Sequence, residues 1–160
     1  MYINNRSELY EHGSDRENCF RSRPRARVWQ ALANVEQFGE WFGVKLVGTF
    51  LPGARLRGKI THPGYEDYPF EITIERMGPE HFFSWRWHPH TTDPKLDYYA
   101  EPTTLVTFEL KDHADGTQLT VVESGFDGIP LSRRLEAYRG NEQGWTMQVE
   151  AIGKYVTKAA

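Results

Sequence analysis

The sequence predicts an α+β fold in which a long C-terminal helix covers a curved antiparallel sheet of about six strands. Three observations predict this fold. Segments in the middle of the chain alternate apolar and polar residues, turn residues separate these segments, and the last part of the chain carries apolar residues at helical spacing. One face of the predicted sheet is rich in aromatic residues and needs a cover, and the final helix is the only predicted element long enough to supply it.

Alternation of apolar and polar residues predicts five strands in the middle of the chain. In residues 54–61, Arg55, Arg57 and Lys59 separate small or apolar residues, which is typical of a half-buried antiparallel strand. Asp115-Gly116 is a strong hairpin signal between the last two strands. The other four predicted strands are residues 70–76, 83–87, 106–110 and 119–123.

The pattern is less regular at the start of the chain. Residues 1–16 are polar and lack a consistent period, so we expect a loose tail there. A first strand is predicted over residues 17–22, in which only Cys19 and Phe20 are apolar. Residues 17–160 are expected to form one domain of ordinary size.

Two short helices are predicted to follow the first strand. Pro24 suits a first helical turn, and Val28 and Leu32 recur at helical spacing after it. This helix is expected to end at Asn34. The second helix is predicted near residues 36–41 and finishes in Phe42-Gly43.

The final helix is predicted from residue 131 to the end of the chain. Gly140 and Gly144 are expected to bend or interrupt it, which would make residues 131–139 a separate turn. Its buried face is predicted from one stripe of apolar residues, namely Trp145, Val149, Ile152 and Val156.

Composition excludes several classes of function. The net charge is −3, so the basic footprint of a nucleic-acid-binding protein is absent. A single cysteine can neither form a disulfide within the chain nor hold an iron–sulfur cluster, and we find no flavin, nicotinamide or phosphate-binding motif. We therefore expect no cofactor and exclude a flavin- and iron–sulfur-dependent reductase. The chain also has no apolar leader and no run long enough to span a membrane, so we expect a cytoplasmic protein.

Glu123 is the most informative polar residue. Leu119 and Val121 precede it at even spacing, so its carboxylate is predicted to point toward the interior. A buried carboxylate needs partners or a raised pKa. One interpretation is a polar anchor or general base in a cavity. The other is a structural ion pair, with Arg86 or an arginine of the last helix, or exposure at the strand end.

Aromatic residues make up 14% of the chain, and such rings line small-molecule cavities as well as cores. Those near the proline-containing loop 88–102 and the final helix are expected to line a cavity, with His88 at its rim. The predicted ligand-binding residues are Trp41, Phe70, Trp85, Trp87, His88, Tyr98, Phe108, Glu123, Trp145 and Val149.

Two other polar clusters are expected to be solvated. His88 and His90, followed by Asp93 and Asp97, lie in the loop and lack the held geometry of a metal site, so we expect no metal. A short basic run at the entry of the first helix is read as a solvated face; it consists of Arg21, Arg23, Arg25 and Arg27.

Short motifs occur in a fixed order between residues 20 and 156. They are Pro24-Arg-Ala-Arg-Val28-Trp29-Gln-Ala31-Leu32, Trp41-Phe42-Gly43, Phe83-Ser-Trp85-Arg-Trp87, Thr103-Thr-Leu-Val106, Asp115-Gly116-Thr117-Gln-Leu119, Glu123-Ser124-Gly125-Phe126 and Asn141-Glu-Gln-Gly144-Trp145. Together they resemble the START-like (SRPBCC) superfamily and, within it, the small bacterial branch of the activators of the Hsp90 chaperone ATPase.

The resemblance implies a helix-grip fold with a hydrophobic cavity between the sheet and the last helix. The sequence departs from the family in the first strand, where relatives usually alternate apolar residues and then continue with Ala-Pro. Here the run is Glu17-Asn-Cys-Phe-Arg-Ser-Arg-Pro24. A different start site or reading frame would produce such a departure in residues 1–23.

The resemblance does not select one activity, because relatives include carriers, receptors, cyclases and co-chaperones. The first hypothesis is a binding protein, a carrier or sensor for a small hydrophobic or aromatic ligand. The second is a co-chaperone-like regulator of a chaperone ATPase, which rests on the family alone. The third is a cyclase- or dehydratase-like enzyme acting on an aromatic or polyketide-like substrate, with Glu123 as acid or base beside Arg86 or His88. The sequence favours binding over catalysis.

Overall fold

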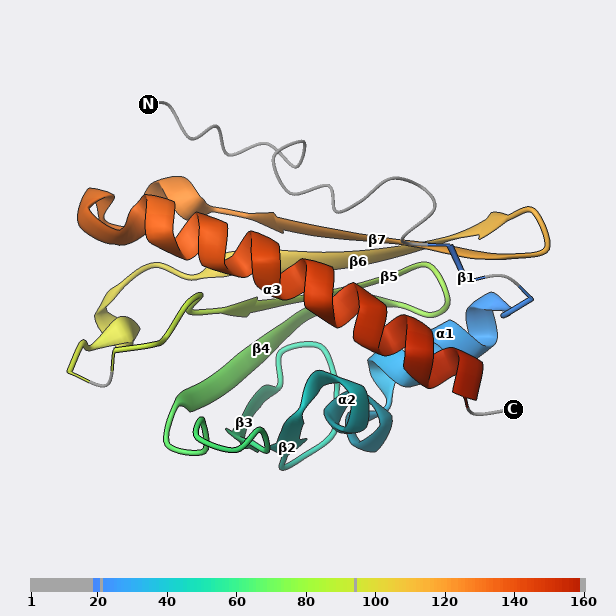
Figure 1. Ribbon diagram of the computed structural model, residues 1–160, viewed down its shortest axis with the longest axis horizontal. Coiled ribbons are helices and arrows are strands. Elements are labelled where there is room, and N and C mark those ends of the chain that lie inside the picture. The colour runs from blue at the N-terminus through green and yellow to red at the C-terminus, as the bar shows by residue number, and fades with distance from the viewer. Residues whose placement is uncertain (1–18, 21, 94, 159–160) are drawn as a thin grey trace.

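A computed structural model describes residues 19, 20, 22–93 and 95–158, and its elements are labelled in Figure 1. The predicted tail of residues 1–16 lies outside these residues. The helices and strands, in chain order, are β1 (Cys19–Phe20), α1 (Arg25–Ala33), α2 (Val35–Phe42), β2 (Val44–Leu46), β3 (Arg55–Ile60), β4 (Pro69–Gly78), β5 (Phe82–Trp87), the 3-10 turn η2 (Tyr98–Ala100), β6 (Thr104–His113), β7 (Gly116–Ser124), the 3-10 turn η3 (Phe126–Gly128) and α3 (Leu131–Lys158).

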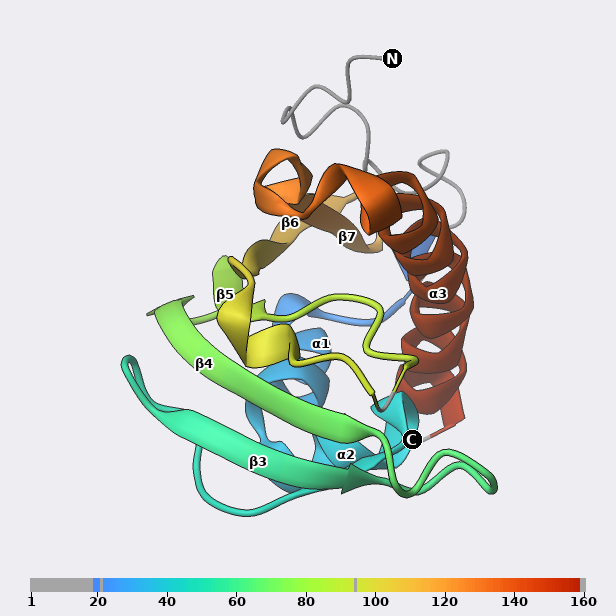
Figure 2. The same cartoon turned by 90° about the vertical axis from the view of Figure 1, so that its left-hand side faces the viewer.

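Within the described residues, the strands form one antiparallel sheet in the order β1-β7-β6-β5-β4-β3-β2. Helix α3 crosses one face of this sheet in Figure 1, and Figure 2 shows the strands curving around that face. The predicted α+β helix-grip fold is therefore confirmed. Strand β2 was not predicted, because its three residues are too few to show an alternation.

The turn between α1 and α2 depends on one residue. The backbone N–H of Asn34 donates to the Gln30 carbonyl at 3.1 Å and closes α1. The Asn34 side chain then accepts from the Gln37 N–H at 3.0 Å and caps α2, as asparagine does at helix N-termini. At the other end of α2, Gly43 has a φ of 86°, a left-handed conformation that glycine adopts without strain. The predicted ends of both helices are thus explained by their caps.

The predicted apolar stripe of α3 faces the sheet. Trp145, Val149, Ile152 and Val156 are all buried. The Trp145 ring centroid lies 5.6 Å from that of Phe108 and 6.1 Å from that of Trp85. Burying a large apolar side chain contributes roughly 1.5–3 kcal/mol, so this stripe supplies much of the attraction between helix and sheet.

Helix α3 is continuous from Leu131 to Lys158, so the expected interruption at Gly140 and Gly144 is wrong. Buried residues on both sides of the glycines hold the helix together. Ala137 and Asn141 are buried before Gly144, and Trp145 is buried directly after it. A glycine within a helix costs about 1 kcal/mol relative to alanine, and tertiary packing here outweighs that cost.

The basic run at the start of α1 contacts its surroundings instead of forming a solvated face. The Arg25 Nε lies 2.9 Å from Asp112 Oδ1 on β6. Arg27 donates to Gln37 Oε1 at 2.9 Å and lies over the Tyr155 ring of α3. Arg23 donates to a backbone carbonyl near the end of α3. Because α1 lies between the sheet end and α3, long cationic side chains reach partners on both, which the sequence pattern did not reveal. Arg21 lies outside the described residues.

Candidate functional site

A pocket of about 640 Å³ lies where α2, the β3–β4 end of the sheet, the segment after β5 and the middle of α3 meet. This volume is within the usual range of small-molecule sites, roughly 300–1,000 Å³. Tyr65, Tyr99 and Met147 are exposed and form part of its mouth. Eight aromatic side chains line the pocket: Trp41, Phe42, Tyr65, Tyr68, Phe70, Trp87, Tyr98 and Tyr99.

The ten predicted ligand-binding residues divide into two groups. Trp41, Phe70, Trp87, His88 and Tyr98 lie on the wall of the pocket. The other five lie in the packed interior behind it, and they are Trp85, Phe108, Glu123, Trp145 and Val149.

The division follows from the position of each residue along its strand. Trp87 is the last residue of β5 and its side chain points toward the interior face of the sheet. Trp85 lies two residues earlier on the same face and is fully buried. The two rings contact each other edge to face, with centroids 4.7 Å apart. Trp87 therefore separates the pocket from the core.

Several wall residues could not be found from the sequence. His62, Tyr65 and Tyr68 come from the connection between β3 and β4, which has no periodicity. The one signal in the sequence was three ring-bearing residues within a short connection. In the structure these rings pack together, with the His62–Tyr65 and Tyr65–Tyr68 centroids 5.5 and 5.2 Å apart. Met147 and Ala151 also line the pocket. They lie beside the buried stripe of α3 and are not part of it, so the apolar periodicity of the helix did not indicate them.

Glu123 is 1% exposed, and its carboxylate points inward from β7 as predicted. Four neutral side chains donate to it. Trp87 Nε1 and Thr104 Oγ1 donate to Oε2 at 2.7 and 2.5 Å. Asn141 Nδ2 and Trp145 Nε1 donate to Oε1, each at 2.8 Å. The carboxylate thereby links β5, β6, β7 and α3.

This arrangement differs from the predicted ion pair. Arg86 lies on the opposite face of the sheet, with its Nε 3.4 Å from Glu75 Oε1. No lysine or arginine of the described part of the chain forms an ion pair with Glu123. Burial raises the pKa of Glu123, while the hydrogen bonds from Thr104 and the other three donors oppose that shift. Both oxygens are occupied and Trp87 stands between them and the pocket, so the geometry favours a structural anchor over a general base.

The segment between β5 and β6 forms one side of the pocket and is held to α3. Arg133 Nε donates to both oxygens of Glu101, at 3.0 and 2.9 Å, and the guanidinium lies 4.8 Å from the Tyr98 ring centroid. His88 Nε2 lies 3.0 Å from the Glu101 carbonyl oxygen. His90, the other histidine of this segment, lies 3.5 Å from Glu136. Among the residues that the structure describes, no group of three or more metal-ligating side chains gathers.

The chain matches a known protein family over most of its length. The family model described as Activator of Hsp90 ATPase homolog 1-like protein matches residues 22–157. No curated protein matched the sequence. Within the described residues, none of the helices combines the length and apolar character needed to cross a membrane.

Solved structures share the fold at low sequence identity. Protein MLL2253 from Mesorhizobium loti superposes with a TM-score of 0.68 and 23% identity, covering 88% of this chain and 93% of that one. Protein Ms6760 from Mycobacterium smegmatis gives 0.67 and 19%, covering 94% and 98%. DynU16, a protein from the dynemicin biosynthetic locus, gives 0.65 and 23%, covering 86% of this chain but 44% of its own.

Proposed function

Because this chain belongs to the family of Activator of Hsp90 ATPase homolog 1-like proteins, we propose that it binds a small aromatic or hydrophobic ligand in the pocket beside Trp87, as a carrier or sensor. The START-like fold of this family is compatible with a ligand-binding domain. The proposal concerns the pocket itself, because aromatic side chains from several elements meet around it.

The observation that carries the proposal is how the pocket rings use their polar atoms. Trp41 Nε1 donates to the Ala31 carbonyl at 2.7 Å, and Trp87 Nε1 donates to Glu123. Both indole N–H groups are therefore satisfied within the protein, and the rings offer only apolar surface to a ligand. The hydroxyls of Tyr65 and Tyr99, which are exposed at the mouth, remain for polar contacts. This favours a ligand with a flat apolar body and a polar group directed outward.

Binding of the neutral dye N-phenylnaphthylamine tests the proposal, since its fluorescence rises in an apolar site. Ala151 lies on the pocket wall, so Ala151→Trp should fill the space and weaken dye binding by about 10-fold or more. Ala26 is exposed on α1, away from the pocket, and Ala26→Trp is the matched control. Equal dye binding by both variants and the wild type would overturn the proposal.

The family description favours a second candidate, regulation of a chaperone ATPase. The expected observation is a change in the ATPase rate of an Hsp90-type chaperone when this protein is added, together with co-purification. An unchanged rate and no complex would remove this candidate. The third hypothesis, an enzyme using Glu123 as acid or base, gains no support, because Glu123 does not reach the pocket.

A further inference from the structure

We propose that the pocket selects uncharged aromatic ligands over anionic ones, and that Glu123 sets this preference from behind Trp87. The inference rests on the proposed function, because it concerns what the same pocket accepts. It assigns Glu123 a role in specificity that does not require contact with the ligand.

The wall of the pocket offers no permanent cation to an anionic ligand, and its basic groups are the imidazoles of His62, His88 and His90. Among its described residues there is no lysine or arginine, and the one carboxylate is that of Glu71. Glu71 already faces two arginines, with Arg55 Nε at 3.4 Å and Arg57 Nε at 2.5 Å. Two arginines beside one glutamate leave a net positive charge. The side chains of Arg55 and Arg57 are 65% and 74% exposed, so water and salt screen that charge.

Glu123 is 1% exposed, so solvent does not screen it, and unlike the part-buried Glu101 beside Arg133 it has no cationic partner among the described residues. Burial opposes its ionisation, but both of its oxygens accept hydrogen bonds and three of its four donors are N–H groups, which can only donate. The geometry therefore favours an ionised carboxylate, and no described lysine or arginine pairs with its negative charge. Trp87 contributes its ring to the pocket wall and its Nε1 to Glu123, so a single side chain separates the two. In a low-dielectric interior the charge acts across that ring, and a ligand anion would meet repulsion as well as the loss of its hydration.

Naphthamide and naphthoate form a matched pair of probes, since they share a shape and differ in charge. The titrations are made at about pH 8. We expect naphthamide to bind the wild type about 10-fold or more tightly than naphthoate. Equal affinities for the two probes would overturn the inference and leave the proposed function standing. Failure of both probes to bind would overturn the proposed function itself.

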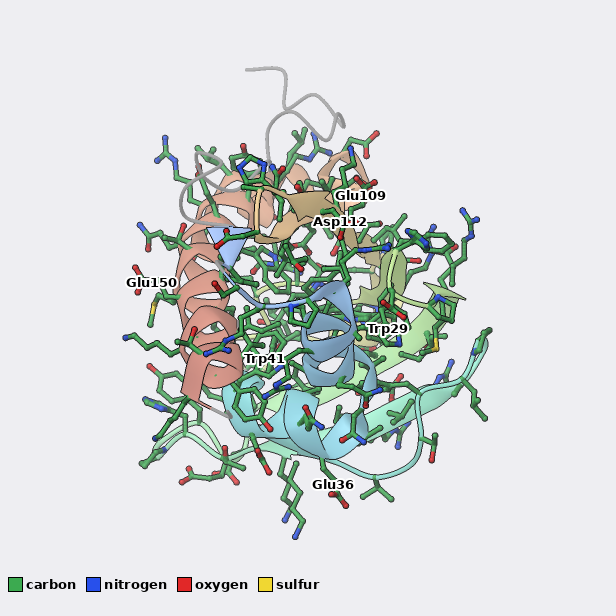
Figure 3. The ribbon with its side chains drawn as sticks, turned by 90° about the vertical axis from the view of Figure 1, so that its right-hand side faces the viewer. Trp29, Glu36, Trp41, Glu109, Asp112 and Glu150 are labelled. Atoms are coloured by element: carbon green, nitrogen blue, oxygen red, sulfur yellow. The ribbon has the colours of Figure 1, made fainter. Side chains whose placement is uncertain are left out.

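Replacement of Glu123 by glutamine tests the assigned residue. Glu123→Gln removes the charge at nearly constant volume, so the preference for naphthamide should fall several-fold, chiefly through tighter naphthoate binding. Glu109 is an exposed carboxylate on β6, labelled in Figure 3, and Glu109→Gln should leave the preference unchanged. A preference that survives in Glu123→Gln would contradict the assignment.

A measurement on the wild type covers the case in which Glu123→Gln does not fold. Salt at about 1 M shortens the screening length to about 3 Å and suppresses exposed charges, but it does not reach a buried carboxylate. The preference for naphthamide should therefore persist in high salt. Its collapse would show that surface charges cause it, and would exclude Glu123 as the source.

Discussion

The imidazole of His90 packs against Gly140 of α3 so closely that a Cβ at residue 140 would lie 2.5 Å from its Nδ1. His90 also lies on the pocket wall and has a φ of 54°, which is uncommon for a residue with a side chain. Because Gly140 has no side chain, His90 and the segment between β5 and β6 can pack directly against α3. This explains a glycine in the middle of a long helix.

Gly140 and Gly144 of α3 should respond in opposite directions to alanine. Gly140→Ala is expected to lower the free energy of unfolding by about 1 kcal/mol or more, because the new methyl group displaces His90. No atom of the described part of the chain lies within 4 Å of a Cβ at Gly144, so Gly144→Ala should raise the free energy of unfolding by about 0.5–1 kcal/mol through helix propensity. Urea denaturation of both variants measures the difference. A stabilised Gly140→Ala would contradict the packing argument.

The Arg133–Glu101 pair should contribute more than an exposed pair. Their side chains are 12% and 16% exposed, whereas those of Arg86 and Glu75 are 44% and 37% exposed. A double-mutant cycle to alanine should give a coupling of about 1–2 kcal/mol for the first pair, and about 0.5 kcal/mol or less for the second. Similar couplings for both pairs would mean that the bidentate contact does not anchor the pocket segment.

Two buried tryptophans allow the Glu123 hydrogen bonds to be tested by the same substitution. Trp145 Nε1 donates to Glu123, while the buried Trp85 Nε1 has no hydrogen-bond partner among the residues that the structure describes. Replacement of tryptophan by phenylalanine removes the same atoms at both sites. Only Trp145→Phe also removes a hydrogen bond to the buried Glu123 carboxylate. Trp145→Phe should therefore destabilise the protein by about 1–2 kcal/mol more than Trp85→Phe, as measured by thermal and chemical unfolding. The opposite order would refute the proposed importance of this bond.

Stability should fall as Glu123 ionises. Burial raises its pKa above the ordinary 4.5, so the folded protein keeps a proton that the unfolded chain has already released. The free energy of unfolding attributable to this residue should decrease as pH rises from about 4.5, and level off once Glu123 is ionised in the folded state.

Glu123→Gln isolates that contribution, since the amide does not titrate. The unfolding free energy of the wild type minus that of the variant should decline with rising pH in urea titrations. Other titrating groups are common to both proteins and cancel in the difference. A difference that increases with pH would show that the four donors outweigh burial and lower the pKa.

The fold could be predicted because its signals are local and repeated. Alternation over β3, β4 and β7 and the apolar stripe of α3 each follow from which face is buried. The inward direction of Glu123 followed from the same period of two. By contrast, β2 is only three residues long, and it forms because β3 offers a free edge, not because of its own pattern.

The site was harder to predict because it depends on side chains that meet from distant segments. Nothing in the sequence shows that Trp87 and Trp145 both direct an indole N–H at Glu123, since such bonds depend on the separation between helix and sheet. An arginine was the expected partner because charge is visible in a sequence, whereas donor geometry is not. The same reason hid His62 and Tyr68, whose place on the pocket follows from how an irregular connection folds.

The pairing of β1 with β7 has a consequence for biosynthesis. Cys19 lies opposite Gln118, so β1 cannot pair until β7, far later in the chain, has been synthesised. Until β7 is present, β1 has no strand with which to pair, so α1 and α2 must form before β1 joins the sheet. Such non-local closure slows folding, and it makes the newly completed β7 edge a point where a nascent chain can pair with a neighbour instead of with itself.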